Sequence, residues 1–166
     1  MTTNAWEVIA PEQPLQQGEV LFGLDLGSFE DVAPDVIVLT QSCDLYPQNG
    51  KPPRAKKVLL IAFSQLGDLS KADIGNWRKN YNGNTPSALL LPNIHNQVSF
   101  NLEGMYALNF YELFCVNRTI LETHLQRDCS IRYGLQHPYV TNLASHFAHF
   151  ISRVGLPALP DLPKQA

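Results

Sequence analysis

Residues 36–45 read VIVLTQSCDL and supply the main evidence for the fold. The first part, Val36–Thr40, is an unbroken run of β-branched and aliphatic residues that follows Pro34. A run of this length is typical of a strand that is buried on both faces. The polar part, residues 41–44, comes directly after it. This stretch therefore predicts a central strand whose end carries polar side chains, which is a common position for functional groups.

The rest of the chain predicts more strands before a closing helix. Further strands are expected at Glu19–Leu24, Lys57–Phe63, Ala88–Leu91, Val98–Leu102, Tyr106–Asn109 and Leu113–Val116. Helices are expected at Ser70–Tyr81, at Asn117–Leu125 and from Pro138 to the residue before Gly155. Apolar residues of the last helix form one stripe at helical spacing. Strands followed by a closing helix, without β–α alternation, predict an α+β fold built on a small barrel or curved sheet, with a helical insertion.

The composition is that of one globular domain of 166 residues, with 45% hydrophobic and 16% charged residues. We expect the domain to span residues 1–157 and a Pro-rich tail to follow at 158–166. Trp6 is expected to pin the N-terminal segment onto the barrel. The three cysteines, Cys43, Cys115 and Cys129, form no C-x-x-C pair, so neither a disulfide framework nor a zinc ribbon is indicated, and a cytoplasmic location is expected.

Charge and hydropathy limit the expected partners. The net charge of −3 gives no basic excess for non-specific attraction to nucleic acid. No apolar run approaches the roughly 18 residues of a membrane helix. No glycine-rich phosphate loop is present, so a Rossmann or P-loop nucleotide site is not expected. We predict another protein as the partner, no membrane, no cofactor and no metal, and leave nucleic acid as an alternative.

Two motifs resemble those of a poorly characterised bacterial family. Residues 40–45, TQSCDL, resemble its (S/T)Q-x-CD-(I/L) signature at a strand end. His137-Pro138-Tyr139 and the later FAHFISRVGLP, residues 147–157, resemble its closing helix. The two matches bracket roughly residues 15–157, and the resemblance brings no established activity with it.

The front of the chain resembles PemK/MazF-like toxins, which are SH3-like barrels that cut RNA. The similar residues are Gly18–Phe22, Asp25-Leu26 and Asp35–Thr40. The resemblance implies an SH3-like barrel here. In that family a basic residue in the loop before the second strand serves catalysis. The corresponding loop, 27–34, has acidic residues but no Arg or Lys, so Arg54 or Arg132 would have to supply the cation.

Cys43 and Asp44 are the candidate catalytic residues. A thiolate at a strand end can act as a nucleophile when a base or cation lowers its pKa. One of the five histidines would be the base and Asp44 would orient it. The alternative is that Cys43 is a small buried residue and Asp44 caps the next turn.

Six residues are candidates for binding a partner or ligand: Gln41, Arg54, His95, His146, His149 and Arg153. His146, His149 and Arg153 share one face of the closing helix with Asn142. Two histidines three residues apart can bind a metal, but no further ligand is near in the sequence, so a hydrated polar face is the alternative. Arg54 belongs to a basic cluster that would touch a phosphate backbone or simply be solvated. His95 lies in an expected turn.

Three functions follow from these observations. The leading hypothesis is a non-catalytic protein-interaction module of a bacterial stress or defence system. The first alternative is a PemK/MazF-like RNA endonuclease. The second is a cysteine-dependent enzyme that uses Cys43.

Overall fold

The computed structural model describes residues 5–24, 35–65, 88–92, 105–127 and 132–153. The strands are β1 (Trp6–Ile9), β2 (Glu19–Leu21), β3 (Val36–Val38), β4 (Lys57–Gln65), β5 (Ala88–Pro92), β6 (Met105–Asn117) and β7 (Arg132–Leu135). The helices are α1 (Ser42–Leu45), α3 (Arg118–Arg127) and α4 (Tyr139–Arg153). The expected helix at 70–81, the expected strand at 98–102, and the tail lie outside the described residues.

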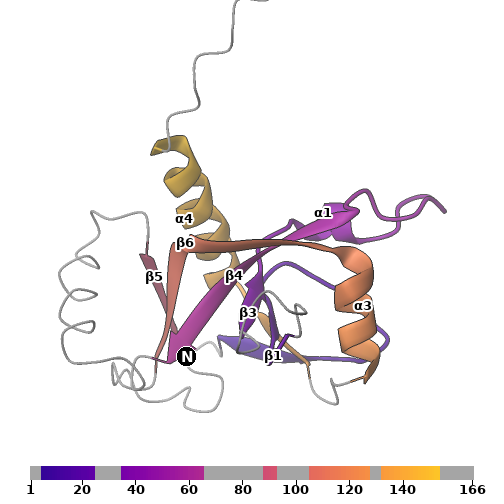
Figure 1. Ribbon diagram of the computed structural model, residues 1–166, viewed down its shortest axis with the longest axis horizontal. Coiled ribbons are helices and arrows are strands. Elements are labelled where there is room, and N and C mark those ends of the chain that lie inside the picture. The colour runs from indigo at the N-terminus through magenta and orange to yellow at the C-terminus, as the bar shows by residue number, and fades with distance from the viewer. Residues whose placement is uncertain (1–4, 25–34, 66–87, 93–104, 128–131, 154–166) are drawn as a thin grey trace, which may run out of the picture.

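The described strands form one antiparallel sheet in the order β1-β7-β2-β3-β4-β6-β5. The sheet is strongly curved and forms a half-barrel, with α4 near one end and α3 near the other (Figure 1). The expected α+β fold with a curved sheet and a closing helix is therefore confirmed. The predicted strand at the start of VIVLTQSCDL lies inside the sheet, between β2 and β4.

Apolar clusters cover both faces of the sheet, which explains the unbroken apolar run in β3. Ile37 belongs to a cluster that includes Leu143 and Phe150 of α4. Val36 and Val38 belong to the cluster on the other face, which includes residues of α1 and α3. Successive side chains of a strand point to opposite faces, so each residue of β3 meets one of the two clusters. All three are fully buried.

Trp6 ties the first strand to the far side of the curved sheet. Its indole N–H donates a hydrogen bond of 2.7 Å to the carbonyl of Pro92 at the end of β5. Its ring also makes an edge contact with Tyr106 of β6, with centroids 6.2 Å apart. Because β1 and β5 are the outermost of the described strands, this contact draws the ends of the described sheet together. The expected anchoring role of Trp6 is confirmed.

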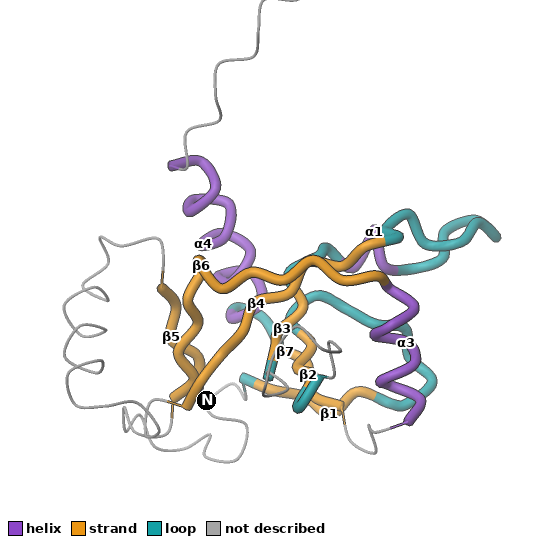
Figure 2. The backbone as a smooth tube through the Cα atoms, viewed as in Figure 1, coloured by secondary structure: helices purple, strands orange, loops and turns teal. Residues whose placement is uncertain are grey.

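β6 differs most from the sequence prediction. The expected separate strands at Tyr106–Asn109 and Leu113–Val116 are parts of one strand of 13 residues. The separation into two was wrong because a bulge interrupts the pattern: Ile61 pairs with Leu113, whereas Phe63 pairs with Leu108. β6 turns at this bulge and runs on toward α3, as Figure 2 shows.

Asn109 holds the bulge together with its side chain. Its carbonyl oxygen accepts a hydrogen bond of 3.1 Å from the Tyr111 backbone N–H. Its amide nitrogen donates one of 2.9 Å to Glu112. A bulge commonly re-aims side chains. Here Phe110 is fully buried, while the Tyr111 side chain is 75% exposed.

Candidate interaction surface

Two polar side chains of VIVLTQSCDL form hydrogen bonds with the backbone of neighbouring segments. The Thr40 hydroxyl accepts a hydrogen bond of 2.8 Å from the Leu59 backbone N–H of β4. The Ser42 hydroxyl accepts one of 3.0 Å from the Gln17 backbone N–H, just before β2. The Gln17 side chain in turn donates to the Leu39 carbonyl at 2.9 Å. These bonds hold the residues after β3 against β4 and against the segment that precedes β2.

Cys43 is exposed on α1, so its interpretation as a small buried residue is wrong. Its thiol lies 3.5 Å from the side-chain carbonyl oxygen of Gln41, and its backbone carbonyl accepts a hydrogen bond from Gln48. The contacts described for Cys43 include no histidine. Asp44 acts through its backbone: its N–H donates to the Gln41 carbonyl and its carbonyl accepts from the Ala55 N–H. Gln41, Cys43 and Asp44 therefore lie together, without a base among their described neighbours.

The histidines of α4 lie at the border of its buried stripe. His149 is exposed, whereas His146 is half-buried. Burial lowers the pKa of His146 from its ordinary value, and the charge of His149 lowers it further. Arg153 is the last residue of α4. Within the described ranges, no group of three or more His, Cys, Asp or Glu side chains is placed to hold a metal ion.

The remaining candidate binding residues, Arg54 and His95, have no described contact with the histidines of α4. Arg54 is exposed, as are Lys56 and Lys57, just before and at the start of β4. His95 lies outside the described residues. The structure places Gln41 on the turn into α1 and Arg54 in the neighbouring segment, where the Ala55 N–H bonds to the Asp44 carbonyl, whereas His146 and His149 lie on α4.

Arg132 is not placed as a substrate-binding cation. It is 3% exposed, and its guanidinium makes two hydrogen bonds, of 2.6 and 2.8 Å, to the carboxylate of the fully buried Glu19. It also donates to the backbone carbonyls of Ala10, Pro11 and Gln13. These contacts join β7 to β2 and fasten the segment after β1.

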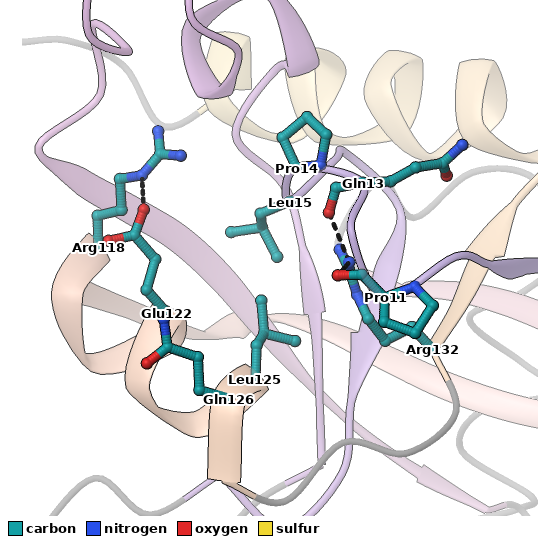
Figure 3. Close-up of a pocket in the computed structure, with 9 residues that line it drawn as sticks. All are labelled: Pro11, Gln13, Pro14, Leu15, Arg118, Glu122, Leu125, Gln126 and Arg132. Carbon is teal, nitrogen blue, oxygen red and sulfur yellow. Dashed lines mark hydrogen bonds and ion pairs between the residues drawn. The ribbon is translucent and has the colours of Figure 1, made fainter.

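One pocket, of about 480 Å³, lies between that fastened segment and α3 (Figure 3). Pro11, Gln13, Pro14 and Leu15 form one wall, and Arg118, Glu122, Leu125 and Gln126 of α3 form the other, with Arg132 behind. Arg118 pairs with Glu122 at 2.6 Å and donates to the Leu45 carbonyl at 2.8 Å. Both arginines of this pocket are thus bound to protein acceptors.

A second pocket, of about 430 Å³, brings the two family-like motifs together. Ser42, from the first motif, and His137, from the second, both line it, along with Glu7 and Gln136. The Gln136 amide donates to Glu7 at 3.0 Å, and His137 Nδ1 lies 2.7 Å from the Thr141 hydroxyl. The motifs are far apart in the sequence, yet both shape the junction of β1, α1 and α4.

The second half of β6 extends beyond its neighbour. β5 pairs with Met105–Asn109 only, whereas β4 pairs with β6 as far as Asn117. Among the described residues, no strand pairs with β6 on the β5 side after Asn109. In Figure 1 this half of β6 runs from the bulge toward α3.

The hydrogen bonds of β4 show which way the backbone N–H and carbonyl groups of β6 point. Leu59 uses both of its backbone groups on the β3 side: its N–H donates to Thr40 and its carbonyl accepts from the Leu39 N–H. Leu59 pairs with Cys115. Because bond direction alternates along an antiparallel ladder, Cys115 sits at a non-hydrogen-bonded position relative to β4. Its own N–H and carbonyl therefore point away from β4.

The same alternation extends along this half of β6. The Arg118 N–H donates to the Lys56 carbonyl at 3.0 Å, so the even-numbered residues bond to β4. Leu113 and Cys115 therefore point both backbone groups outward, as does the N–H of Asn117, whereas the Asn117 carbonyl precedes α3 and belongs to the start of that helix. We call these three residues the free edge of β6: Leu113, Cys115 and Asn117. The side chains of Cys115 and Asn117 are exposed, and Leu113 is half-buried.

Apolar side chains lie next to the free edge. Tyr111 is exposed and makes an edge contact with Phe150 of α4, with ring centroids 5.1 Å apart. Ile151, the next residue of α4, is 42% exposed. Phe114 and Val116 are half-buried and pack against the cluster under α3. Aromatic residues are enriched in protein interfaces relative to the rest of the surface.

Neither the protein-family models nor the curated proteins that were compared contain a match to this chain. In the ranges that the structure describes, no helix combines the length and the apolar character needed to span a membrane.

The sequence prediction missed the free edge and Tyr111. It placed short strands on both sides of residues 110–112, so neither seemed to extend past a neighbour. One signal was available: residues 110–117, FYELFCVN, contain no Lys, Arg or Pro. Natural sheets usually place such residues on edges that face water.

Proposed function

We propose that this protein is a non-catalytic interaction module that binds another protein chain by adding a strand to its sheet. The observation that carries the proposal is the free edge of β6, where Leu113 and Cys115 point both backbone groups outward and Asn117 points its N–H outward. In β-augmentation, such main-chain groups supply affinity, and the side chains on alternate positions supply specificity.

The side chains beside the edge support a protein partner. Glu112 is the only charged residue from Phe110 to Asn117, so an incoming apolar strand would meet little charge to desolvate. Tyr111 and Ile151 extend an apolar surface from the edge to α4. The resemblance to PemK/MazF-like toxins supports a role for this module in a bacterial stress or defence system.

The test uses the full-length protein and short linear peptides selected from a displayed library. Amide exchange, followed residue by residue by NMR, is the readout. A peptide that adds to the sheet should slow exchange at Leu113, Cys115 and Asn117. It should leave Phe114 and Val116 nearly unchanged, because their N–H groups are already bonded to β4.

Paired variants provide the control. Cys115→Lys puts a charge on the free edge, whereas Cys43→Lys puts the same charge on α1, at another exposed cysteine. We expect the first to weaken peptide binding and the second to leave it intact. Selected peptides that bind equally well to both variants, with no protection at the odd-numbered residues, would refute the proposal.

A further inference from the structure

We infer that the strand added to the free edge of β6 comes from a second copy of this chain, in an antiparallel pair centred on Cys115. This inference rests on the proposed function, because it uses the same edge and names its partner. It follows from the self-complementary pattern of residues 112–118, ELFCVNR.

Backbone geometry allows this register. In an antiparallel pair, residues that point their N–H and carbonyl groups toward each other lie opposite one another. A two-fold axis at Cys115 places Cys115 opposite Cys115 of the second copy. It also places Leu113 opposite Asn117 of the second copy, and the reverse. Each of the three residues then lies opposite one of the three, so both backbone groups of Leu113 and Cys115 and the N–H of Asn117 face a residue of the second copy.

Side chains fit the same register. Phe114 falls opposite Val116 of the second copy, and the symmetry repeats this contact. Aromatic and β-branched residues are favourable cross-strand pairs, worth roughly 0.2–1 kcal/mol each. Both residues already pack against the cluster under α3, so the pair would continue the apolar surface of one copy into the other.

Charge favours the antiparallel arrangement. The segment starts with an acidic residue, Glu112, and ends with a basic residue, Arg118. The two-fold axis brings Glu112 to the start of α3 in the second copy, where Arg118 is already paired with Glu122 of its own chain. A parallel, in-register pair would instead set like charges side by side, which is destabilising. Symmetric dimers of this isologous kind are the commonest oligomers of soluble proteins.

The natural cysteine provides a direct test. At the centre of the pair the two Cys115 Cα atoms would be about 5.5 Å apart, close enough for a short bifunctional maleimide to link the two thiols. The unmodified protein, prepared as a mixture of ¹⁵N-labelled and unlabelled chains, is treated with this reagent and digested. Mass spectrometry should find Cys115 linked to Cys115 between labelled and unlabelled chains, in excess over links that involve Cys43.

Sedimentation equilibrium on the natural protein and two variants completes the experiment. We expect a dimer whose dissociation constant rises about tenfold or more in Cys115→Lys, since two charges then face each other at the axis. Cys43→Lys should leave the dimer unchanged. Circular dichroism and urea titration check that both variants fold, and the crosslink, which needs no variant, tests the inference if one does not.

The outcomes separate this inference from the proposed function. A monomer at all concentrations, whose free edge is protected by a selected peptide, overturns the second copy as partner and leaves the interaction module standing. A dimer that Cys115→Lys does not weaken, or whose crosslinks avoid Cys115, overturns the inference as well. A monomer with no peptide protection overturns both.

Discussion

Replacing Arg132 with Met should destabilise the protein severely, although its strand, β7, is separated from β6 by three strands of the sheet. The change removes the guanidinium that pairs with Glu19, whose side chain has no solvent exposure. Breaking a buried ion pair by removing one partner typically costs about 3–5 kcal/mol, because an uncompensated charge remains buried. Three backbone carbonyls also lose their donor, but they lie in a segment that is partly exposed and can bind water instead.

Urea unfolding followed by circular dichroism measures this loss. A reduction of about 3–5 kcal/mol would consume a large part of the roughly 5–15 kcal/mol that stabilises a typical domain. The double variant Glu19→Gln, Arg132→Met should regain a substantial part of it, because no buried charge is then left alone. Arg54→Met is the matched control: Arg54 is exposed, and substitutions at exposed positions usually change the free energy of unfolding by about 0.5 kcal/mol or less. Equal, small losses for Arg132→Met and Arg54→Met would refute the reasoning.

Three further predictions concern the Thr40 hydrogen bond and the titrating groups. Thr40→Ala leaves the partly buried N–H of Leu59 without its acceptor, so urea unfolding should show a loss of about 0.5–1.5 kcal/mol. His146 has a lowered pKa because of its burial and a second histidine, so the folded state resists its protonation. The free energy of unfolding should therefore fall as the pH drops below 6.5, and His146→Gln should fall less steeply in the same titration. Cys43 and Cys115 are both exposed, so an alkylating reagent followed by mass spectrometry should label both in the folded protein; slow labelling of either until unfolding would contradict its placement.

Local patterns predicted those parts of the fold that neighbouring residues determine. The unbroken apolar run of β3 follows from burial on both faces, and the apolar stripe of α4 follows from its packing against one face. β1 and β7 could not be recognised in this way. Each has only four residues, and they are stabilised by pairing with each other across more than 120 residues of sequence. The Glu19–Arg132 pair, which joins β2 to β7, likewise depends on contacts that no local pattern reveals.

The candidate site illustrates the same limit. The sequence identified TQSCDL as a distinctive motif, but it could not show that Thr40 and Ser42 use their hydroxyls to bind neighbouring backbone. It also could not show that Cys43 is exposed. Its thiol faces Gln41, a residue two positions away. Distinctive polar residues at a strand end can be catalytic or can hydrogen-bond the backbone of neighbouring segments, and only their hydrogen-bond partners distinguish the two roles.

The two ends of the described sheet differ in how much strand edge they leave without a neighbouring strand. β1 has only four residues, and a short edge strand is one common protection against unwanted pairing. The Trp6 hydrogen bond to Pro92 also holds β1 in place. β5 also has few residues, five, but the strand it covers has 13. The difference in length leaves half of β6 as an edge in the described sheet, without the lysines or prolines that usually protect one. A sheet that restrains one edge and leaves the other apolar is consistent with a partner strand at the second, and the length of β6 is the structural reason for it.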